Sequence, residues 1–252
     1  MIKLTPLPKN IESVTDIANV VTELPKDKRF LFRGQTVNKP PLPRFAREVH
    51  ERKLSSENIY KLEKQMLERF RIESLPFLQG LPQPQTDFDW LSIAQHHGLP
   101  TRLLDWTANA LAALWFAVSP HSHEKTDEGV IWILEVEPDN VKKPDPSENP
   151  FELRRTYIFQ PFHIDRRITA QAGWFSIHRY AEERGKFYAL DRIKIYRPHL
   201  RRHVVPSSRF AGLRDELRIL GITEATLFPD LSGLCAEIQA ETLRTFRAPT
   251  TI

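Results

Sequence analysis

Prolines constrain the fold of this chain more than any other residue type. The chain contains 20 prolines against 9 glycines, and the prolines gather at residues 5–8, 40–43, 76–84 and 138–150. Proline fixes φ and cannot donate a backbone hydrogen bond, so it interrupts helices and central strands. Each cluster separates stretches of regular apolar spacing, and no internal repeat links those stretches. The clusters therefore predict loops within one folded domain.

Between the prolines, apolar spacing predicts both helices and strands. Helical spacing and capping residues predict helices over 11–24, 56–74, 88–97, 108–118, 208–220 and 231–246. Bulky apolar runs predict strands at 30–32, 129–137 and 192–197. Because the two kinds of element alternate without a regular βαβ rhythm, the sequence predicts an α+β fold. We expect a compact single domain with a mixed central sheet flanked by helices.

The net charge and the cysteine content limit the kinds of binding partner and the cellular compartment that we expect for this chain. The 36 Lys and Arg residues exceed the 32 Asp and Glu residues by a small margin, and the net charge of +4 permits an anionic partner without requiring one. A single cysteine, Cys235, excludes an intramolecular disulfide and favours a reducing compartment. The first residues lack the apolar stretch of a signal peptide, and the longest apolar run, 110–118, is too short to span a bilayer. We therefore expect a cytoplasmic protein with no membrane partner.

The stretch KRFLFRGQTVNKP, residues 28–40, places an arginine at the end of an apolar strand. Arg33 follows this apolar run, and Gly34 and Pro40 indicate that the strand ends in a turn. A guanidinium presents a planar fork of donors that matches phosphate or carboxylate oxygens and keeps its charge. We expect Arg33 to be a partly buried anion clamp at the mouth of a pocket, without a carboxylate neighbour.

The segment 90–118 contains further candidate residues. On the helix expected over 88–97, His97 shares a face with apolar residues, whereas His96 turns away from them. A histidine at that place is either a core ring bonded to a carbonyl or a functional group.

Two charges in the same segment also need an explanation. Arg102 and Asp105 flank two leucines, which keeps both charges close to buried surface, where charges need partners. One explanation is structural, either a mutual ion pair or a helix cap made by Asp105. The other is that Arg102, Arg33 and His97 converge on one phosphate or carboxylate.

Several short motifs follow one another in a distinctive order. They are Phe32-Arg33-Gly34, the string QHHGLPTRLLDWT at 95–107, Ala110-Leu111 and Phe116-Ala117. In this order they resemble the FRG domain, which is named after its Phe/Tyr-Arg-Gly triplet. The segments 129–134, 167–175 and 221–234 are also similar to that family, so the resemblance covers about residues 28–240. It implies a helical extension at residues 1–27 and an FRG domain at residues 28–247.

This chain departs from the family pattern at two places. His97 stands where the family often has Tyr, and Ala108-Asn109 stands where a proline commonly opens the helix. Members of the family occur in bacterial and phage-related settings. Together with the expected anion clamp at Arg33, the resemblance leads us to expect a bacterial nucleotide-handling effector that acts in defence.

A second likeness is to ADP-ribosyltransferases of the arginine-serine-glutamate class, in which an arginine at the end of the first strand holds the NAD pyrophosphate. The chain has Gln171 where that class has a glutamate. These likenesses imply NAD as the cofactor. From these likenesses and from the proposed convergence of Arg33, Arg102 and His97 on one anion, we expect catalytic roles for Arg33, His97 and Gln171. We expect cofactor-binding roles for the set Arg33, Gly34, Arg102, Asp105 and Trp106.

The sequence gives weaker signals for other kinds of site and function. The sequence lacks a His-Glu-x-x-His metal motif, a Gly-x-Gly-x-x-Gly turn and a P-loop, so we expect no metal site. A nucleic-acid-binding or cleaving module that uses the basic stretch 192–209 remains an alternative, and so do basic pairs at 154–155 and 166–167. A third alternative is a non-enzymatic interaction module in which Arg33 and Asp105 form a structural pair. The carboxylates Glu135 and Glu137, on the strand at 129–137, are expected to be solvated.

Overall fold

A six-stranded sheet forms the centre of the molecule. The computed structural model describes residues 10–78, 82–119, 128–161 and 169–246. The strand order is β4-β5-β2-β1-β3-β8, and each neighbouring pair is antiparallel. The strands are β1 Arg29–Gln35, β2 Leu103–Thr107, β3 Glu128–Val136, β4 Tyr157–Phe159, β5 Gly173–Ile177 and β8 Leu200–Pro206, and a separate hairpin consists of β6 Tyr180–Ala181 and β7 Lys186–Phe187.

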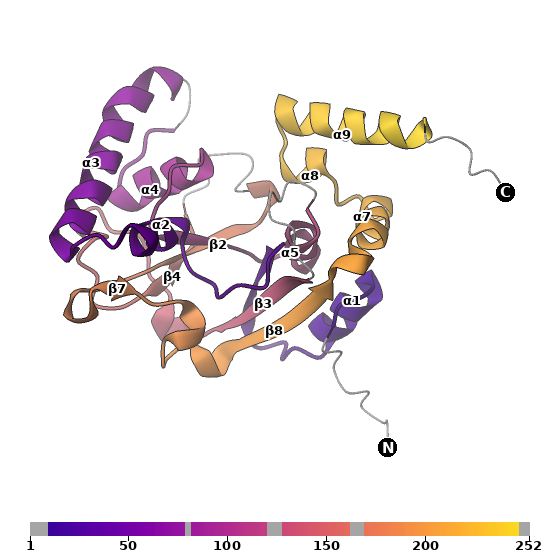
Figure 1. The fold of residues 1–252 in the computed structure, drawn as a ribbon, viewed down its shortest axis with the longest axis horizontal. Helices are drawn as coiled ribbons and strands as arrows, with labels where there is room; N and C mark the ends of the chain where they lie inside the picture. The colour runs from indigo at the N-terminus through magenta and orange to yellow at the C-terminus, as the bar shows by residue number, and fades with distance from the viewer. Residues whose placement is uncertain (1–9, 79–81, 120–127, 162–168, 247–252) are drawn as a thin grey trace.

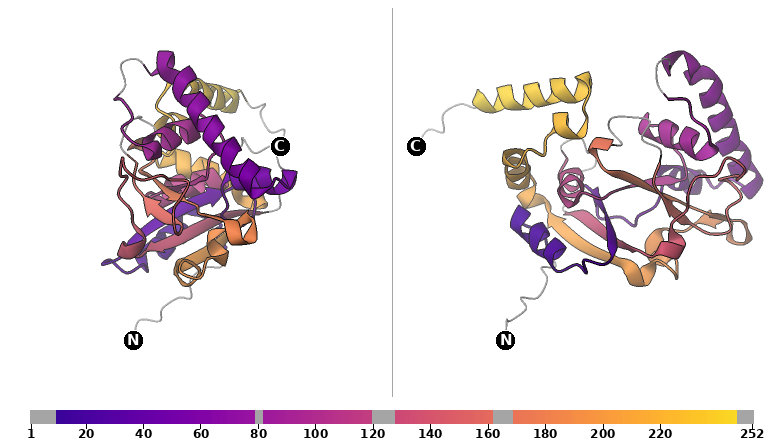
Figure 2. Two further views of the ribbon diagram at one scale, coloured as in Figure 1. Left: turned by 90° about the vertical axis from the view of Figure 1, so that its left-hand side faces the viewer. Right: turned by 180° about the vertical axis from the view of Figure 1, so that it is seen from behind.

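Helices surround this sheet. They are α1 Val14–Thr22, α2 Arg44–Arg52, α3 Ser56–Ser74, α4 Asp87–His96, α5 Ala110–Ala117, α7 Phe210–Ile219, α8 Glu224–Leu227 and α9 Leu231–Thr245. Helices α2, α3 and α4 lie near one end of the sheet, α1, α5 and α7 lie near the other, and α9 extends away from the body (Figures 1 and 2). The predicted α+β class and the central sheet flanked by helices are confirmed, whereas the sheet expected to be mixed is antiparallel between all its neighbouring strands. Among the described residues, none of the helices has both the length and the apolar character to cross a membrane.

Both faces of the sheet are buried. One face packs against α1, α5 and α7 through residues such as Phe32, Ile133 and Val205. The opposite face forms its own apolar cluster, which includes three buried tryptophans, Trp106, Trp132 and Trp174. Ile17 and Val20 of α1 belong to the same core as Phe32, so the helix before residue 28 packs into the main body. The division into residues 1–27 and 28–247 stays a prediction.

Helix α5 lies directly on the backbone of two strands. A Cβ built on Gly34 of β1 would lie 1.7 Å from the carbonyl oxygen of Ala113, and one on Gly129 of β3 would lie 2.6 Å from that of Ala117. Neither position has room for a side chain, and α5 itself is rich in alanine. This close approach explains why a glycine follows Arg33: β1 has to present its backbone to α5 one residue after it presents the guanidinium.

The structure contains a strand that the sequence did not predict. Residues 103–107 form β2, which pairs with β1 and β5. Strand β2 ends at Thr107. The helix expected from residue 108 begins at Ala110, because Asn109 caps α5 by accepting from the backbone N–H groups of Leu111 and Ala112.

The strand predicted at 192–197 is wrong. Short 3-10 turns occupy Leu190–Arg192 and Arg197–His199, and strand β8 begins at Leu200. Tyr196 anchors this region because its ring is buried and its hydroxyl donates to the carbonyl of Thr156 at 2.9 Å. Local spacing does not reveal this anchor, since the partner lies 40 residues away.

We predict that Gly34→Ala destabilises the protein by at least about 1–3 kcal/mol, because the added methyl group overlaps the backbone of α5. The matched control is Gly212→Ala on α7, where an added Cβ meets no atom within 4 Å. That control is expected to be neutral or stabilising, since alanine favours a helix. Urea unfolding of both variants measures the difference, and equal free energies of unfolding would contradict the close approach.

Candidate functional site

A cavity of about 300 Å³ lies beside the end of β1. Its lining includes five residues that the sequence singled out, Arg33, Gly34, Asp105, Trp106 and Gln171. They come from β1, from β2 and from the turn before β5. The structure therefore brings these five candidates together, while their roles in binding or catalysis stay predictions.

Arg33 does have a carboxylate neighbour. Its Nη1 donates to the backbone carbonyl of Asp105 at 2.8 Å and lies 3.5 Å from the Oδ2 of the same residue. Its Nε donates to Gln35 Oε1 at 2.9 Å. The expectation that Arg33 has no carboxylate neighbour is wrong, because β2 brings Asp105 alongside it. Within the described part of the chain, the Nη2 group of Arg33 makes no hydrogen bond.

The charge of Arg33 is held in a mostly buried position. Its side chain is 17% exposed, whereas that of Asp105 is 57% exposed. Burial lowers the pKa of Arg33, the Asp105 carboxylate opposes that shift, and the nearby Arg47 guanidinium adds to it. An arginine remains protonated under such influences. Arg33 therefore offers a permanent positive charge at the edge of the cavity.

Gln95, the first residue of the motif at 95–107, makes side-chain hydrogen bonds to Thr101 and Asp105 further along it. Its side-chain oxygen accepts from Thr101 Oγ1 at 2.9 Å, and its side-chain nitrogen donates to Asp105 Oδ2 at 3.1 Å. Thr101 Oγ1 in turn accepts from the backbone N–H of Leu103 at 3.0 Å. This relay fixes the turn between α4 and β2 and orients the Asp105 carboxylate toward Arg33. Sequence reasoning did not single out Gln95 individually.

Arg102 does not take part in this site. It is fully buried and forms a bidentate ion pair with Glu63 of α3, with Nε to Oε1 at 2.8 Å and Nη2 to Oε2 at 2.6 Å. Its Nη1 donates to the carbonyls of Pro150 and Phe151. The prediction that Arg102 binds the same anion as Arg33 is wrong, and so is a mutual pair of Arg102 with Asp105. Arg102 instead links α3, β2 and the segment before β4.

The two histidines have the opposite placement from the one predicted. His96 is half-buried and lines the cavity, whereas His97 is exposed and follows the last residue of α4. The rings pack edge to face with their centroids 4.8 Å apart. The prediction that His97 shares the apolar face is wrong, because the helix ends at His96. His97 therefore lies outside the cavity lining.

A buried hydrogen-bond chain orients Trp106, one wall of the cavity. Trp106 Nε1 donates to Ser176 Oγ at 3.0 Å, and Ser176 Oγ lies 3.1 Å from His178 Nε2. His178 Nδ1 lies 3.0 Å from the carbonyl of Tyr188. Because a carbonyl only accepts, Nδ1 carries the proton, Nε2 accepts from Ser176, and Ser176 is left to accept from Trp106. Burial lowers the pKa of His178 to about 3, so its ring stays neutral.

Gln171 is held through both its backbone and its side chain. Thr107 Oγ1 donates to the Gln171 carbonyl, and Gln171 Nε2 donates to the carbonyl of Leu227 at 3.1 Å. The next residue, Ala172, has φ of +46°, an unusual backbone conformation for alanine that stores strain. An amide has no proton-accepting role comparable to a carboxylate. Gln171 is therefore suited to recognising a ligand by hydrogen bonds rather than to acting as a base.

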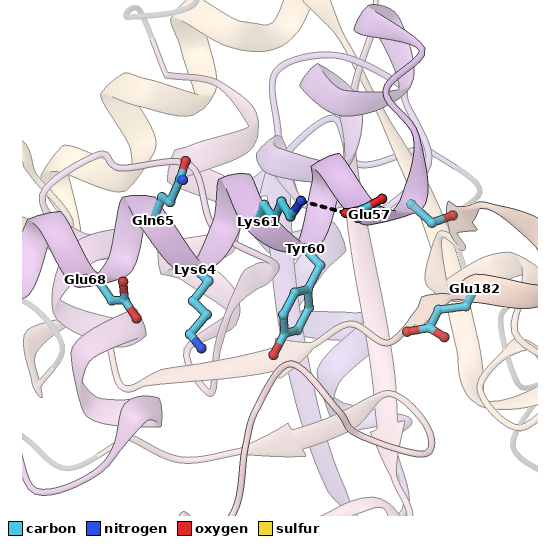
Figure 3. Close-up of a pocket in the computed structure, with 8 residues that line it drawn as sticks. Glu57, Tyr60, Lys61, Lys64, Gln65, Glu68 and Glu182 are labelled. Atoms are coloured by element: carbon cyan, nitrogen blue, oxygen red, sulfur yellow. Dashed lines mark hydrogen bonds and ion pairs between the residues drawn. The ribbon is translucent and has the colours of Figure 1, made fainter.

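Larger hollows on the surface have a different character. One, of about 650 Å³, lies along the outer side of α3, where Tyr60, Lys61, Lys64 and Glu68 project from the helix (Figure 3). Lys61 is paired with Glu57 one turn earlier at 2.6 Å. This is a solvated helix face with neighbouring charges, and Tyr60 is the one aromatic residue in its lining, whereas several aromatic residues line the cavity beside Arg33.

The carboxylates of Glu135 on β3 and of Glu137 just after it, which were expected to be solvated, form an ion-pair cluster. Lys28 Nζ lies 3.2 Å from a carboxylate oxygen of Glu135 and of Glu137. His199 completes the one group of three potential metal ligands found within the described residues. The ammonium pairs with both carboxylates, and its pKa is raised, first by its hydrogen bond to Glu135 and then by Glu137. The cluster therefore has a structural explanation.

The basic stretch 192–209 is divided between different surroundings. Arg192 and Arg197 line a hollow of about 580 Å³ together with Trp132. Arg201 lies over the ring of Phe30, and Arg209 Nε donates to the carbonyl of Glu12. The pair at 154–155 is exposed, and the pair at 166–167 lies outside the described residues. Nucleic-acid binding by this stretch stays a prediction.

Comparison with protein families identifies one match. The family model of the FRG domain matches residues 28–126, a range that contains β1, α2, α3, α4, β2 and α5. These elements supply every cavity residue discussed above except Gln171. No curated protein matches this chain, and no solved structure matches it.

We predict that Glu63→Gln costs about 3–5 kcal/mol of stability, because it leaves the Arg102 guanidinium buried without its counter-charge. Glu73→Gln is the control, since Glu73 pairs with Arg69 on the exposed side of the same helix, where solvent screens the pair. Chemical unfolding of both variants makes the comparison. A small and equal effect of the two substitutions would contradict the structural role of Arg102.

We predict that neutral His178 makes stability depend on pH. The unfolded chain protonates this ring below about pH 6.5, whereas the folded protein does so only near pH 3. Lowering the pH through this window therefore favours unfolding, by up to about 1.4 kcal/mol per pH unit from this one group. The test compares urea unfolding of wild type and His178→Gln between pH 4 and pH 7. Identical slopes in the two proteins would rule out a buried neutral ring.

Proposed function

We propose that this FRG domain binds a nucleotide in the cavity beside Arg33. The observation that supports this most strongly is the combination of a mostly buried, permanent positive charge with aromatic side chains in the lining of one cavity of about 300 Å³. That volume is at the lower end of the range for small-molecule sites. It suits one nucleoside unit with its phosphate rather than a whole dinucleotide.

Each part of a nucleotide has a suitable partner there. The Arg33 guanidinium offers donors to phosphate oxygens, and its Nη2 has no hydrogen-bond partner among the described residues. Phe116 and Phe228 pack edge to face on one side of the cavity, with centroids 6.1 Å apart, and Trp106 lies in its lining. Aromatic side chains can pack against a base or a nicotinamide ring.

The polar lining can recognise the sugar. The Asp105 carboxylate and the Gln95 amide lie at the same edge of the cavity as Arg33. Carboxylates accept hydrogen bonds from hydroxyl groups, and amides both donate and accept. A ribose placed between the ring and the phosphate would therefore find partners in these two side chains.

NAD is the nucleotide that we propose to test for turnover. In ADP-ribosyl transfer the bond between the ribose carbon and the nicotinamide nitrogen breaks, and the carbon bonds to an acceptor. A carboxylate can stabilise the positive charge that develops on the ribose. Among the residues that line this cavity, Asp105 is the one that carries a carboxylate, while Gln171 contributes an amide. We therefore assign the stabilising role in any such transfer to Asp105 rather than to Gln171.

We predict that Arg33→Gln weakens the binding of AMP by about tenfold or more, because a charge-assisted hydrogen bond is lost. Arg33→Lys, which keeps the charge but loses the planar fork, should have an intermediate effect. Isothermal titration calorimetry measures both, and thermal unfolding checks that the variants are folded. Arg69→Gln, which removes an exposed charge on α3, is the control and should bind as wild type does.

Two results would contradict this proposal. One is wild-type protein that binds neither AMP nor NAD at millimolar concentration. The other is Arg33→Gln protein that is folded and binds AMP as tightly as wild type. Release of nicotinamide from NAD, measured in parallel, decides whether binding is accompanied by transfer or hydrolysis.

A further inference from the structure

A second cavity adjoins the one described above. Its volume is about 260 Å³, and it shares Arg33, Gln95 and Asp105 with the first cavity. Its other walls come from Arg44 and Arg47 of α2 and from the turn after α4. We call it the arginine cavity. Arg33 and Asp105 therefore lie between two adjoining cavities and line both of them.

The two arginines of α2 face this space because of their spacing. Arg44 and Arg47 are three residues apart on a helix, so they lie on the same face and project toward the turn after α4. Arg44 Nη1 approaches the carbonyl of Gly98 at 3.4 Å, while its Nε pairs with Glu48 at 2.7 Å. Arg47 Nη1 donates to the carbonyl of Leu42. These contacts fix the direction of both arginine side chains, which remain exposed to solvent.

The charge around the arginine cavity is net positive. Three guanidinium groups line it, whereas Asp105 is the one carboxylate among its lining residues, and Glu48, which pairs with Arg44, is a second carboxylate in contact with these arginines. The positive charge of Arg47 acts on Arg33 strongly enough to contribute to the lowered pKa of Arg33. Like charges brought together in this way repel each other, and an anion placed between them would relieve the repulsion.

We infer that the arginine cavity holds a phosphoryl group, so that the whole site selects nucleotides that carry a pyrophosphate. The ring then occupies the aromatic cavity, one phosphate contacts Arg33, and the second phosphate contacts Arg44 and Arg47. This inference rests on the proposed nucleotide binding and adds the substrate class to it. A nucleoside diphosphate and a dinucleotide share the pyrophosphate group; the second nucleoside of a dinucleotide would extend beyond the two cavities.

The experiment compares ligands that differ by one phosphate. Isothermal titration calorimetry without divalent cations, which would mask phosphate charge, is used to measure AMP, ADP, NAD and inorganic pyrophosphate. The proteins are wild type, the double variant Arg44→Gln/Arg47→Gln, and Arg52→Gln. Arg52 lies at the other end of α2 and is not part of the cavity, so it is a control for loss of charge from the same helix.

Wild type should bind ADP about tenfold or more tightly than AMP, because a second phosphate gains charge-assisted hydrogen bonds. The double variant should lose this advantage and bind AMP as before. Arg52→Gln should behave as wild type. Preference for NAD over ADP would identify the second phosphate as the bridge of a dinucleotide, and the reverse preference would identify it as a terminal phosphate.

Other outcomes would overturn the inference separately from the proposed function. Equal affinity of wild type for AMP and ADP, or an advantage of ADP that survives in the double variant, would remove the phosphoryl site while leaving nucleotide binding intact. If AMP and ADP fail to bind but pyrophosphate binds and depends on Arg44 and Arg47, the anion site stands and the aromatic cavity loses its proposed ligand.

Discussion

The site depends on how closely α5 lies on the sheet. Because Gly34 and Gly129 present bare backbone to the carbonyls of Ala113 and Ala117, α5 sits nearer to β1 and β3 than side chains would permit. The short distance places Ala113 and Ala117 of α5 beside the end of β1. Arg33, one residue before the first of these glycines, is thereby held in β1 at the edge of the cavity.

The same contact organises the other side of the cavity. Asn109 caps α5, and its own backbone N–H donates to Thr107 Oγ1 at 2.9 Å. Thr107 in turn holds the backbone of Gln171, while the N–H of Ala108 donates to the carbonyl of Ala172. Residues 107–109, at the junction of β2 and α5, therefore connect the helix that packs on Gly34 to Gln171 in the cavity lining. These hydrogen bonds bring Gln171 to the same cavity as Arg33, although the two residues are distant in sequence.

The sequence predicted the elements whose signals are local. The helices at 56–74, 208–220 and 231–246 carry their own apolar spacing and end signals, and the structure agrees with them within two residues. It did not predict β2, since Leu103 to Thr107 is a short stretch with a charge in its centre. The partner of Arg102 also lay beyond local reasoning, because Glu63 is 39 positions away. The position of Arg33 was recognisable from its motif, whereas its contact with Asp105 depends on strand pairing.

The buried pair of Glu63 and Arg102 limits how this chain can change over evolutionary time. If either partner alone is lost, the other charge is left buried without a counter-charge. Joint replacement by apolar residues of similar volume leaves no charge to compensate. A substitution at position 63 is therefore tolerated only together with a matching substitution at position 102, and the reverse also holds. Relatives that have lost the arginine at position 102 should also lack the acid on α3, even when the pocket residues around Arg33 are unaltered.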